Sequence, residues 1–532
     1  MPIDVTLGPN DNILRTIASA PAGSTIRLNA GTYQLTNGLR LTRAISIEGI
    51  GATPSKLVSS AATAVISYEG RGSLSLKNLE IEHSGNQAAD ILLVKAGRID
   101  GERLSLKGAK QIDGQGGGVG ARVQGSGYLS LDASNVSNNA QYGILLLESA
   151  KASLKQVKVD FHPLHGVYVT ANAELVLWDG GSSSHSQEAG IAFVDNAQGE
   201  VKDIISQANR WGALLGGQAS ANIRDSYLQD NSEAGIIYFN NARGTASGNY
   251  ATGNRFGISM ASSAAPSLVS NTLERNAIGI AVYGQARPEV VSNTLKQNAE
   301  HGIYMAGETT GSFKENQFLS NRNGMSITDS ARPRLEFNSF SANIVGINVL
   351  AQAFPEILNN NISESVQHGV VYSGSSTGLF QNNLSQYHAL QGIVLAENAA
   401  PKLEGNFFEH NGGSGIAYYG HASGIALGNS LKENAQFGIV VSDNALPKLD
   451  GNQLSLNRMS GIAYFGQALG EAVNNFSQGN KEHGMSISGT ASPRVNANSF
   501  KSNQGYGLFI APSAQPNIGE NSFEGNALGN RN

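Results

Sequence analysis

The sequence contains no cysteine and few charged residues. Its 532 residues include 36 Lys and Arg and 41 Asp and Glu, which gives a formal net charge of -5 at pH 7. Without cysteine, the chain can form neither disulfide bonds nor thiolate metal sites, and it has no cysteine nucleophile. The slight acidic excess argues against a nucleic-acid partner, because such proteins carry a basic face.

Long hydrophobic runs are also absent. No stretch approaches the roughly 18 consecutive apolar residues that indicate a membrane span. The first 17 residues lack the basic segment followed by an apolar segment that is typical of a signal peptide. We therefore expect no membrane span, and either a cytoplasmic protein or an exported one whose leader lies outside this sequence.

Glycine, in contrast, is abundant and regularly spaced. From about residue 115 onward, a glycine followed by an apolar residue recurs about every 23 residues, and eighteen of the 64 glycines belong to this series. We call them the marker glycines: Gly120, Gly143, Gly166, Gly190, Gly212, Gly235, Gly257, Gly279, Gly302, Gly324, Gly346, Gly369, Gly392, Gly415, Gly438, Gly461, Gly484 and Gly507. A sustained period of this length indicates one repeating body rather than several globular domains.

Each repeat has the same internal order. Apolar residues stand one and three positions after the marker, as in Ile416 and Tyr418, and this alternation is typical of a β-strand. A Gly or Pro follows nine positions after each marker from Gly235 onward, and such residues end strands. A paired asparagine motif, as at Asn429 and Asn434, then predicts turns whose amides hydrogen-bond the equivalent amides one coil away. The tyrosines three positions after a marker, which are Tyr238, Tyr372, Tyr418 and Tyr464, are predicted to lie in the core.

These features predict an all-β fold, a single right-handed parallel β-helix solenoid with about 22 to 23 residues per coil and coils stacked about 4.8 Å apart. Helical solenoids need longer units with a period of 3.6 residues. We expect residues 1–30 to form a short capping helix and a first strand, and residues 31–532 to form one continuous β-helix. Asp11 is the predicted N-cap of that helix, with Ile13, Leu14, Ile17 and Ala18 on its apolar face. The segment GQGGGVG at 114–120 is interpreted as a coil with a longer glycine turn.

The opening pattern from Ala20 to Tyr33, the segment ISIEGIG at 45–51 and the long repeat together resemble the pectate-lyase-like superfamily of parallel β-helices. The resemblance is to the repeat class found in carbohydrate-binding proteins and sugar hydrolases, and similar coils occur in NosD-type proteins, mannuronan C-5-epimerases and F-box recognition modules. It covers nearly the whole chain and implies the fold more than any one activity. The epimerases carry a D-P-H-(D/E) motif, whereas the nearest stretch here, from Asp160 to Pro163, has these residue types in a different order.

Residues 139–211 hold the densest group of titratable side chains. Because coils stack, residues at equal offsets from successive markers should lie above one another. The group comprises Tyr142, Asp160, His162, His165, His185, Glu188, Arg210 and Trp211. We expect His162 and His185 to lie close together on adjacent coils.

Three interpretations of this group stay open. It could perform acid and base chemistry on a uronate polymer, with a histidine (His162, His165) or Tyr142 as base, Arg210 offsetting charge, and Asp160 and Glu188 as further candidate catalytic residues. It could hold a metal through His162, His165 and His185, and Ca²⁺ or a transition metal is the alternative to the expected absence of a cofactor. It could also be a polar turn whose side chains only hydrogen-bond neighbouring coils.

Outward-facing aromatic residues form a second candidate site. The position four after the marker holds Phe239, Tyr283, Tyr419 and Phe465, and Trp211 stands just before its marker. Exposed aromatic faces suit stacking on sugar rings, although such side chains also fill gaps between coils. We therefore expect a protein that recognises a polysaccharide along one sheet face. The alternatives are a uronan lyase or C-5-epimerase and a scaffold for protein partners, and the oligomeric state is left open.

Overall fold

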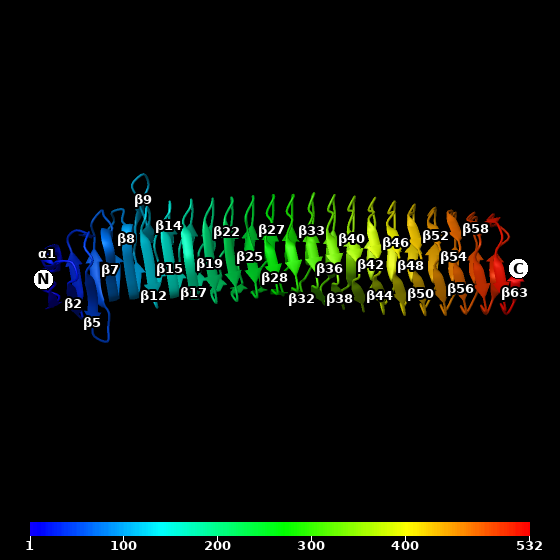
Figure 1. The fold of residues 1–532 in the computed structure, drawn as a ribbon, viewed down its shortest axis with the longest axis horizontal. Coiled ribbons are helices and arrows are strands. Elements are labelled where there is room, and N and C mark those ends of the chain that lie inside the picture. The colour runs from blue at the N-terminus through cyan, green and yellow to red at the C-terminus, as the bar shows by residue number, and fades with distance from the viewer. The chain divides into compact units, whose positions relative to one another are not determined.

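In the computed structural model, all residues from 1 to 532 are described, and short parallel strands dominate the fold (Figure 1). The chain forms two compact units, residues 1–267 and 268–532. Within each unit a coil passes through three strands in a fixed order, and each strand pairs in parallel with its equivalent in the next coil. We name the resulting sheets the marker, middle and third sheets. The expected all-β parallel β-helix is thus confirmed, while the single continuous body over 31–532 stays a prediction.

Unit 1 begins with β1 (Asp4–Leu7), α1 (Ile13–Ser19), β2 (Thr25–Asn29), β3 (Thr32–Leu35), β5 (Ser46–Ile50) and β6 (Ser55–Ser59). Its marker sheet contains β4 (Leu39–Leu41), β7 (Ile66–His83), β8 (Leu92–Lys107), β11 (Val119–Val123), β14 (Tyr142–Leu146), β16 (Val167–Val169), β18 (Ala189–Phe193), β21 (Trp211–Leu215), β24 (Ala234–Tyr238) and β27 (Phe256–Met260). Strands β7 and β8 continue through all three sheets. The remaining strands of the middle and third sheets include β12 (Tyr128–Asp132), β13 (Asn135–Ser137), β15 (Lys151–Asp160), β17 (Glu174–Ser184), β19 (Gln198–Lys202), β20 (Ile205–Gln207), β22 (Ser220–Arg224), β23 (Tyr227–Gln229), β25 (Arg243–Ser247) and β26 (Tyr250–Thr252).

Unit 2 repeats the same order with shorter strands. Its marker sheet contains β30 (Ile278–Val282), β33 (His301–Met305), β36 (Asn323–Ile327), β39 (Val345–Val349), β42 (Val370–Tyr372), β45 (Ile393–Leu395), β48 (Ile416–Tyr418), β51 (Ile439–Val441), β54 (Ile462–Tyr464), β57 (Met485–Ile487), β60 (Tyr506–Ile510) and β63 (Gly529–Arg531). The middle sheet runs from β31 (Glu289–Val291) to β61 (Asn517–Ile518) and the third sheet from β29 (Thr272–Glu274) to β62 (Ser522–Glu524). The four tyrosines predicted for the core are fully buried, one in unit 1 and three in unit 2. No helix is long and apolar enough to cross a membrane.

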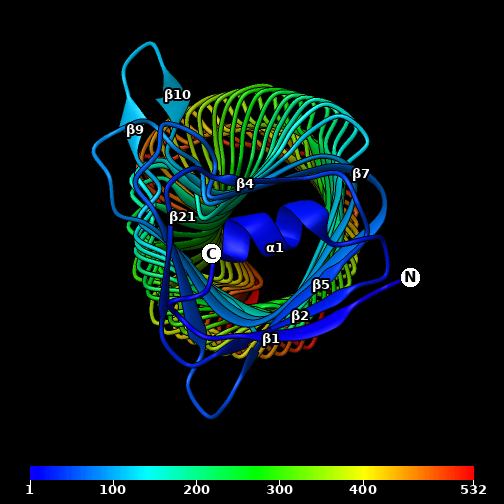
Figure 2. The same cartoon turned by 90° about the vertical axis from the view of Figure 1, so that its left-hand side faces the viewer.

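The helix α1 lies across the end of the first coils, as viewed in Figure 2. Ile13 and Ile17 are buried beneath it, as expected, whereas Ala18 is exposed. The prediction of Asp11 as N-cap is wrong: Asn12 caps the helix by accepting a hydrogen bond from the Arg15 N–H at 2.9 Å. Asp11 instead closes the preceding turn, where its carboxylate accepts the Gly8 N–H at 2.6 Å.

The glycine-rich segment before Gly120 forms a small hairpin. Strands β9 (Gln111–Ile112) and β10 (Gly116–Gly117) pair antiparallel and protrude from unit 1, as Figure 2 shows. The hairpin leads directly into β11 of the marker sheet. The longer glycine turn expected here is therefore a two-stranded excursion from the coil.

Marker glycines are required by close approach between coils. At Gly143, an added Cβ would lie 2.5 Å from the carbonyl oxygen of Gly166 in the next coil. At Gly415, it would lie 2.9 Å from the oxygen of Gly438. At these positions a larger residue would force the coils apart, so the period visible in the sequence records this packing limit.

A column of buried amides follows the third sheet in each unit. Asn434 shows the pattern: its Oδ1 accepts from the side-chain Nδ2 of Asn411 at 3.0 Å, and its Nδ2 donates to Phe408 O and to Asn457 Oδ1, each at 3.0 Å. Members of the column are Asn139, His162, Ser186, Asn209, Asn231 and Asn254 in unit 1, and Asn276, Asn298, Asn321, Asn343, Ser365, His388, Asn411, Asn434, Asn457, Asn480, Asn503 and Asn526 in unit 2. The predicted asparagine ladder is confirmed, and histidine or serine replaces asparagine at four positions.

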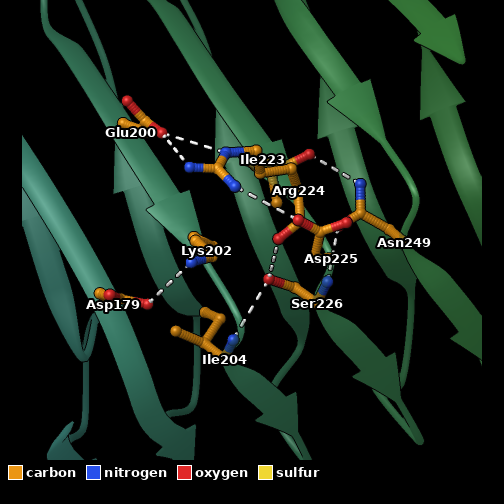
Figure 3. A network of polar contacts seen from close by, with 9 residues as sticks. All are labelled: Asp179, Glu200, Lys202, Ile204, Ile223, Arg224, Asp225, Ser226 and Asn249. Carbon is orange, nitrogen blue, oxygen red and sulfur yellow. Dashed lines mark hydrogen bonds and ion pairs between the residues drawn. The ribbon is translucent and has the colours of Figure 1, made fainter.

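On the middle sheet of unit 1, charged side chains of successive coils pair with one another (Figure 3). The guanidinium of Arg224 donates to Glu200 through Nε at 3.0 Å and Nη2 at 2.7 Å. Lys202 Nζ lies 3.8 Å from Asp179. This face therefore neutralises its own charges.

A second column, formed by the first asparagine of each paired motif as at Asn429, lies at the turn beyond these pairs, and serine can replace asparagine in it. Ser226 Oγ accepts the Ile204 N–H at 3.2 Å, and the Ser226 N–H donates to Asn249 Oδ1 at 3.1 Å (Figure 3). The coil-to-coil link thus passes through a hydroxyl without a break.

Replacing Asn434 by Ala should destabilise unit 2 by about 3 kcal/mol, because it leaves buried backbone and amide groups of three neighbouring residues without partners. Urea unfolding and hydrogen exchange of the neighbouring coils measure the loss. Asn361→Ala, at an exposed position of the third sheet, is the matched control and should change stability little. If the two variants were equally stable, the asparagine ladder would not contribute to the free energy of unfolding as predicted.

Candidate functional site

Three aromatic rings stack on the outward face of the marker sheet in unit 1. Tyr168 lies two positions after its marker and His165 one position before it, and their ring centroids are 4.9 Å apart. Tyr142, from the preceding coil, stacks on Tyr168 at 5.3 Å with an angle of 8° between the planes. Tyr142 and His165 are thus brought together as the sequence suggested, at 6.0 Å between centroids.

The next coil presents alanines in place of rings. Ala189 and Ala192 face outward but are completely buried, because larger side chains of the adjoining coils cover them. Tyr168, Trp211 and Phe239 pack against the cluster that these alanines form with Leu214. The aromatic side chains therefore fill the space above small residues and remain half-buried, each with part of its surface in solvent.

Arg210 and Trp211 form the other end of this aromatic strip. The Arg210 guanidinium carbon lies 4.2 Å from the centre of the Trp211 ring, and Arg210 Nη1 lies 3.4 Å from Glu188 Oε2. Arg255 repeats the arrangement two coils on, 4.9 Å from the Phe256 ring. An open hollow of about 540 Å³ adjoins Arg210, with His185, Asp230 and Glu233 also in its wall.

A buried ion pair continues the strip towards the first coils. Arg122 donates to Asp90 through Nε at 2.7 Å and Nη2 at 3.2 Å, and Asp90 also accepts the Val119 N–H at 3.0 Å. Only 9% of the Asp90 side chain is exposed. Sequence reasoning missed this pair because its coil has Ile91 in place of a marker glycine, so Asp90 could not be assigned to a column.

The sequence also missed Tyr168. From the sequence, the position just before each marker and the position four after it were considered. The position two after the marker also faces outward, and Tyr168 stands there. In unit 2 that column supplies Tyr304 and Phe509. A count of aromatic residues at this offset would have found all three.

The remaining residues proposed for catalysis lie apart from the strip. His162 is 1% exposed within the buried amide column, where Nε2 lies 3.2 Å from Val136 O and Nδ1 3.5 Å from Asn139 O. Burial lowers the pKa of His162, and the two carbonyls oppose that effect only in part. A buried ring between two carbonyls cannot face a ligand, so His162 belongs to the buried amide column rather than to a binding site.

Asp160 and His185 meet at a turn on the third sheet. Ser184 Oγ donates to Asp160 Oδ1 at 2.6 Å and lies 3.0 Å from His185 Nδ1. The exposed His185 ring stacks on Phe161 at 4.5 Å. The His162 ring is thus buried and the His185 ring exposed, so the two do not face one site, and no group of three or more side chains that could hold a metal ion occurs in the structure.

The aromatic residues expected as contacts in unit 2 directly follow strands of its marker sheet. Tyr283 stands 5.9 Å from Tyr304, which packs against His301 at 5.1 Å. Phe465 meets the edge of Phe437 at 5.5 Å. Tyr419 is half-buried, and burial raises the pKa of its hydroxyl. Unit 2 thus has its own aromatic clusters on the equivalent sheet.

A family model described as the right-handed β-helix region matches residues 117–273, 165–318, 211–361, 278–431, 345–478 and 391–530. The chain belongs to this family. For a right-handed β-helix protein, the outward face of a sheet is free to vary because the inward face and the turns hold the coils. No curated protein matches the sequence significantly.

Solved structures similar to this β-helix protein are distant. The periplasmic alginate epimerase AlgG is 15% identical, with 62% of this chain and 78% of that chain covered and a TM-score of 0.37. The Agl-KA catalytic domain is 12% identical, with coverage of 59% and 64% and a TM-score of 0.40. The pectate lyase Pel9A is 11% identical, with coverage of 67% and 78% and a TM-score of 0.25. Likenesses this distant carry no argument about the site.

His165 should remain neutral in mildly acidic solution, because burial lowers its pKa from 6.5 to about 4. The unfolded chain takes up this proton near pH 6.5, so stability is retained above that pH and falls as the pH drops towards 4. Titration of the ring by NMR should give a midpoint near 4. The melting temperature of His165→Gln should fall less steeply than that of the wild type over this range, and a midpoint near 6.5 would contradict the buried geometry.

Proposed function

We propose that the protein binds an extended polysaccharide along the outward face of the marker sheet in unit 1. The observation that carries the proposal is the strip of half-buried rings formed by Tyr142, His165, Tyr168 and Trp211, with Arg210 at its end, on coils stacked about 4.8 Å apart. Aromatic side chains offer apolar contact area together with a polar group, and both are needed to hold a sugar.

The stacked rings define how a glycan would be held. Rings that stack on one another offer their edges and hydroxyl groups to solvent, so Tyr142 and Tyr168 would contact sugar hydroxyls. Trp211 with Arg210 above it provides the larger apolar surface and a hydrogen-bond donor. Glu188, which pairs with Arg210, can accept from further hydroxyls.

The contacts of the histidines favour binding over turnover. His165 Nδ1 accepts the Ala189 N–H at 3.0 Å, so in the neutral ring the other nitrogen carries the proton and cannot act as a base. His162 faces two backbone carbonyls, and Asp160 is held by Ser184. Proton abstraction requires a base, a cation and an acid around one point. The contacts of His165, His162 and Asp160 do not support such an arrangement.

The marker sheet of unit 2 supports a second contact surface of the same kind. Tyr419 and Phe465 stand two coils apart at the same outward offset, and both are half-buried. We include Tyr283, Tyr419 and Phe465 in the proposal as contacts within unit 2, and Phe239 as a contact within unit 1.

Trp211→Ala and Tyr168→Ala should each weaken glycan binding by about threefold to tenfold, because an aromatic contact contributes about 0.5 to 1.5 kcal/mol. A glycan array identifies the polymer and affinity electrophoresis measures retention. Tyr227→Ala is the matched control, since this tyrosine is 51% exposed on the third sheet. Equal retention by all three variants, or no binding to any glycan, would overturn the proposal.

Incubation with several polyuronates should leave them unchanged. Release of unsaturated products that absorb in the ultraviolet, or a change in uronate ratio by NMR, would instead favour a lyase or epimerase. Co-purification of a stoichiometric protein partner from native cells, without glycan binding, would favour a scaffold.

A further inference from the structure

A hollow opens at the N-terminal end of the marker sheet in unit 1, separate from the aromatic strip. Its volume is about 440 Å³, which lies in the range of about 300 to 1,000 Å³ of small-molecule sites. Strand pairing places Arg40, Ser67 and Leu93 side by side on the outward face of β4, β7 and β8. The small side chain of Ser67 between two larger ones leaves the depression.

The walls of the hollow carry an excess of positive charge. Arg40 Nη2 and Lys95 Nζ approach the same carboxylate oxygen of Glu69, at 3.8 and 3.9 Å. Both distances exceed that of a hydrogen bond, so the donors of the two cations are not used within the protein. Two cations and one carboxylate leave one uncompensated positive charge. Asp90, on the same coil as Leu93, is already bound by Arg122.

The remaining wall is suited to an organic ligand rather than a simple ion. Asn37 and Thr63 provide polar groups in the wall, and Leu93 provides an apolar surface. A planar guanidinium beside an ammonium matches a carboxylate, since the guanidinium can donate two parallel hydrogen bonds. The polar and apolar walls match a small hydroxylated carbon frame.

We propose that this hollow binds a small carboxylate ligand of the sugar-acid type, with Arg40 and Lys95 on the carboxylate and Asn37, Thr63 and Ser67 on hydroxyl groups. Glu69 lies beside both cations and competes with the ligand for them. The site is independent of the aromatic strip and does not require that the strip bind a polymer.

Isothermal titration at low ionic strength with D-glucuronate, D-glucose and inorganic sulfate tests the site. Glucuronate should bind more tightly than glucose or sulfate. Arg40→Gln and Lys95→Gln should each weaken glucuronate binding by about tenfold, since each removes a hydrogen bond to a charged group. Glu69→Gln should strengthen it severalfold, because the competing carboxylate is gone.

Lys77→Gln is the matched control, since its side chain is 45% exposed, against 44% for Lys95, and it pairs with Glu102 on the middle sheet. It should bind glucuronate as the wild type does. Equal affinity for glucose, or no effect of the Arg40 and Lys95 variants, would overturn the proposal. Sulfate binding as tight as glucuronate binding would overturn the carboxylate assignment. Tighter binding of oligomeric glucuronate that is lost in the Arg40 and Lys95 variants would identify a polymer end as the source of the carboxylate.

Discussion

The buried amide ladder is the interaction on which the rest of the structure depends. An asparagine of the column such as Asn434 bonds the amides of both neighbours and a backbone carbonyl of the preceding coil, so a change in one coil affects the next. Together with the glycine contacts, it fixes the rotational register of every coil. Only because the register is fixed can side chains at one offset form continuous columns on the surface.

The three sheets use their outward faces differently. On the middle sheet of unit 1, acids and bases of successive coils pair with each other, which leaves little for a ligand. On the marker sheet, rings and arginines meet small residues and solvent. The hollow at Arg40 lies on that same sheet, where a serine interrupts the row of larger side chains. Function is therefore expected where the repeat is least regular.

Much of the fold could be predicted from the sequence, because a period of about 23 residues with a glycine, an apolar pair and two asparagines has few structural solutions. The core tyrosines and the asparagine ladder followed directly from their offsets. The site followed only in part. His162 was grouped with His165 by spacing, but its position in the asparagine column commits its ring to the interior. Asp90 and the Ser67 and Leu93 walls of the hollow belong to early coils with Val65 and Ile91 at the marker position, so no offset from a marker glycine could place them.

The residues that depart from the repeat have a consequence for folding. A uniform asparagine column does not distinguish the correct pairing of coils from a shifted one, because a chain that skipped one coil would still form the same hydrogen bonds between amides. The ion pair between Glu200 and Arg224, the ring of Tyr168 above Ala192, and the histidines within the ladder each fit only one neighbour. A skipped coil would place a ring against a ring or leave a carboxylate unpaired. These irregular pairs therefore distinguish individual coils from one another. They disfavour pairing of coils in the wrong order, which the regular glycines and asparagines alone would permit.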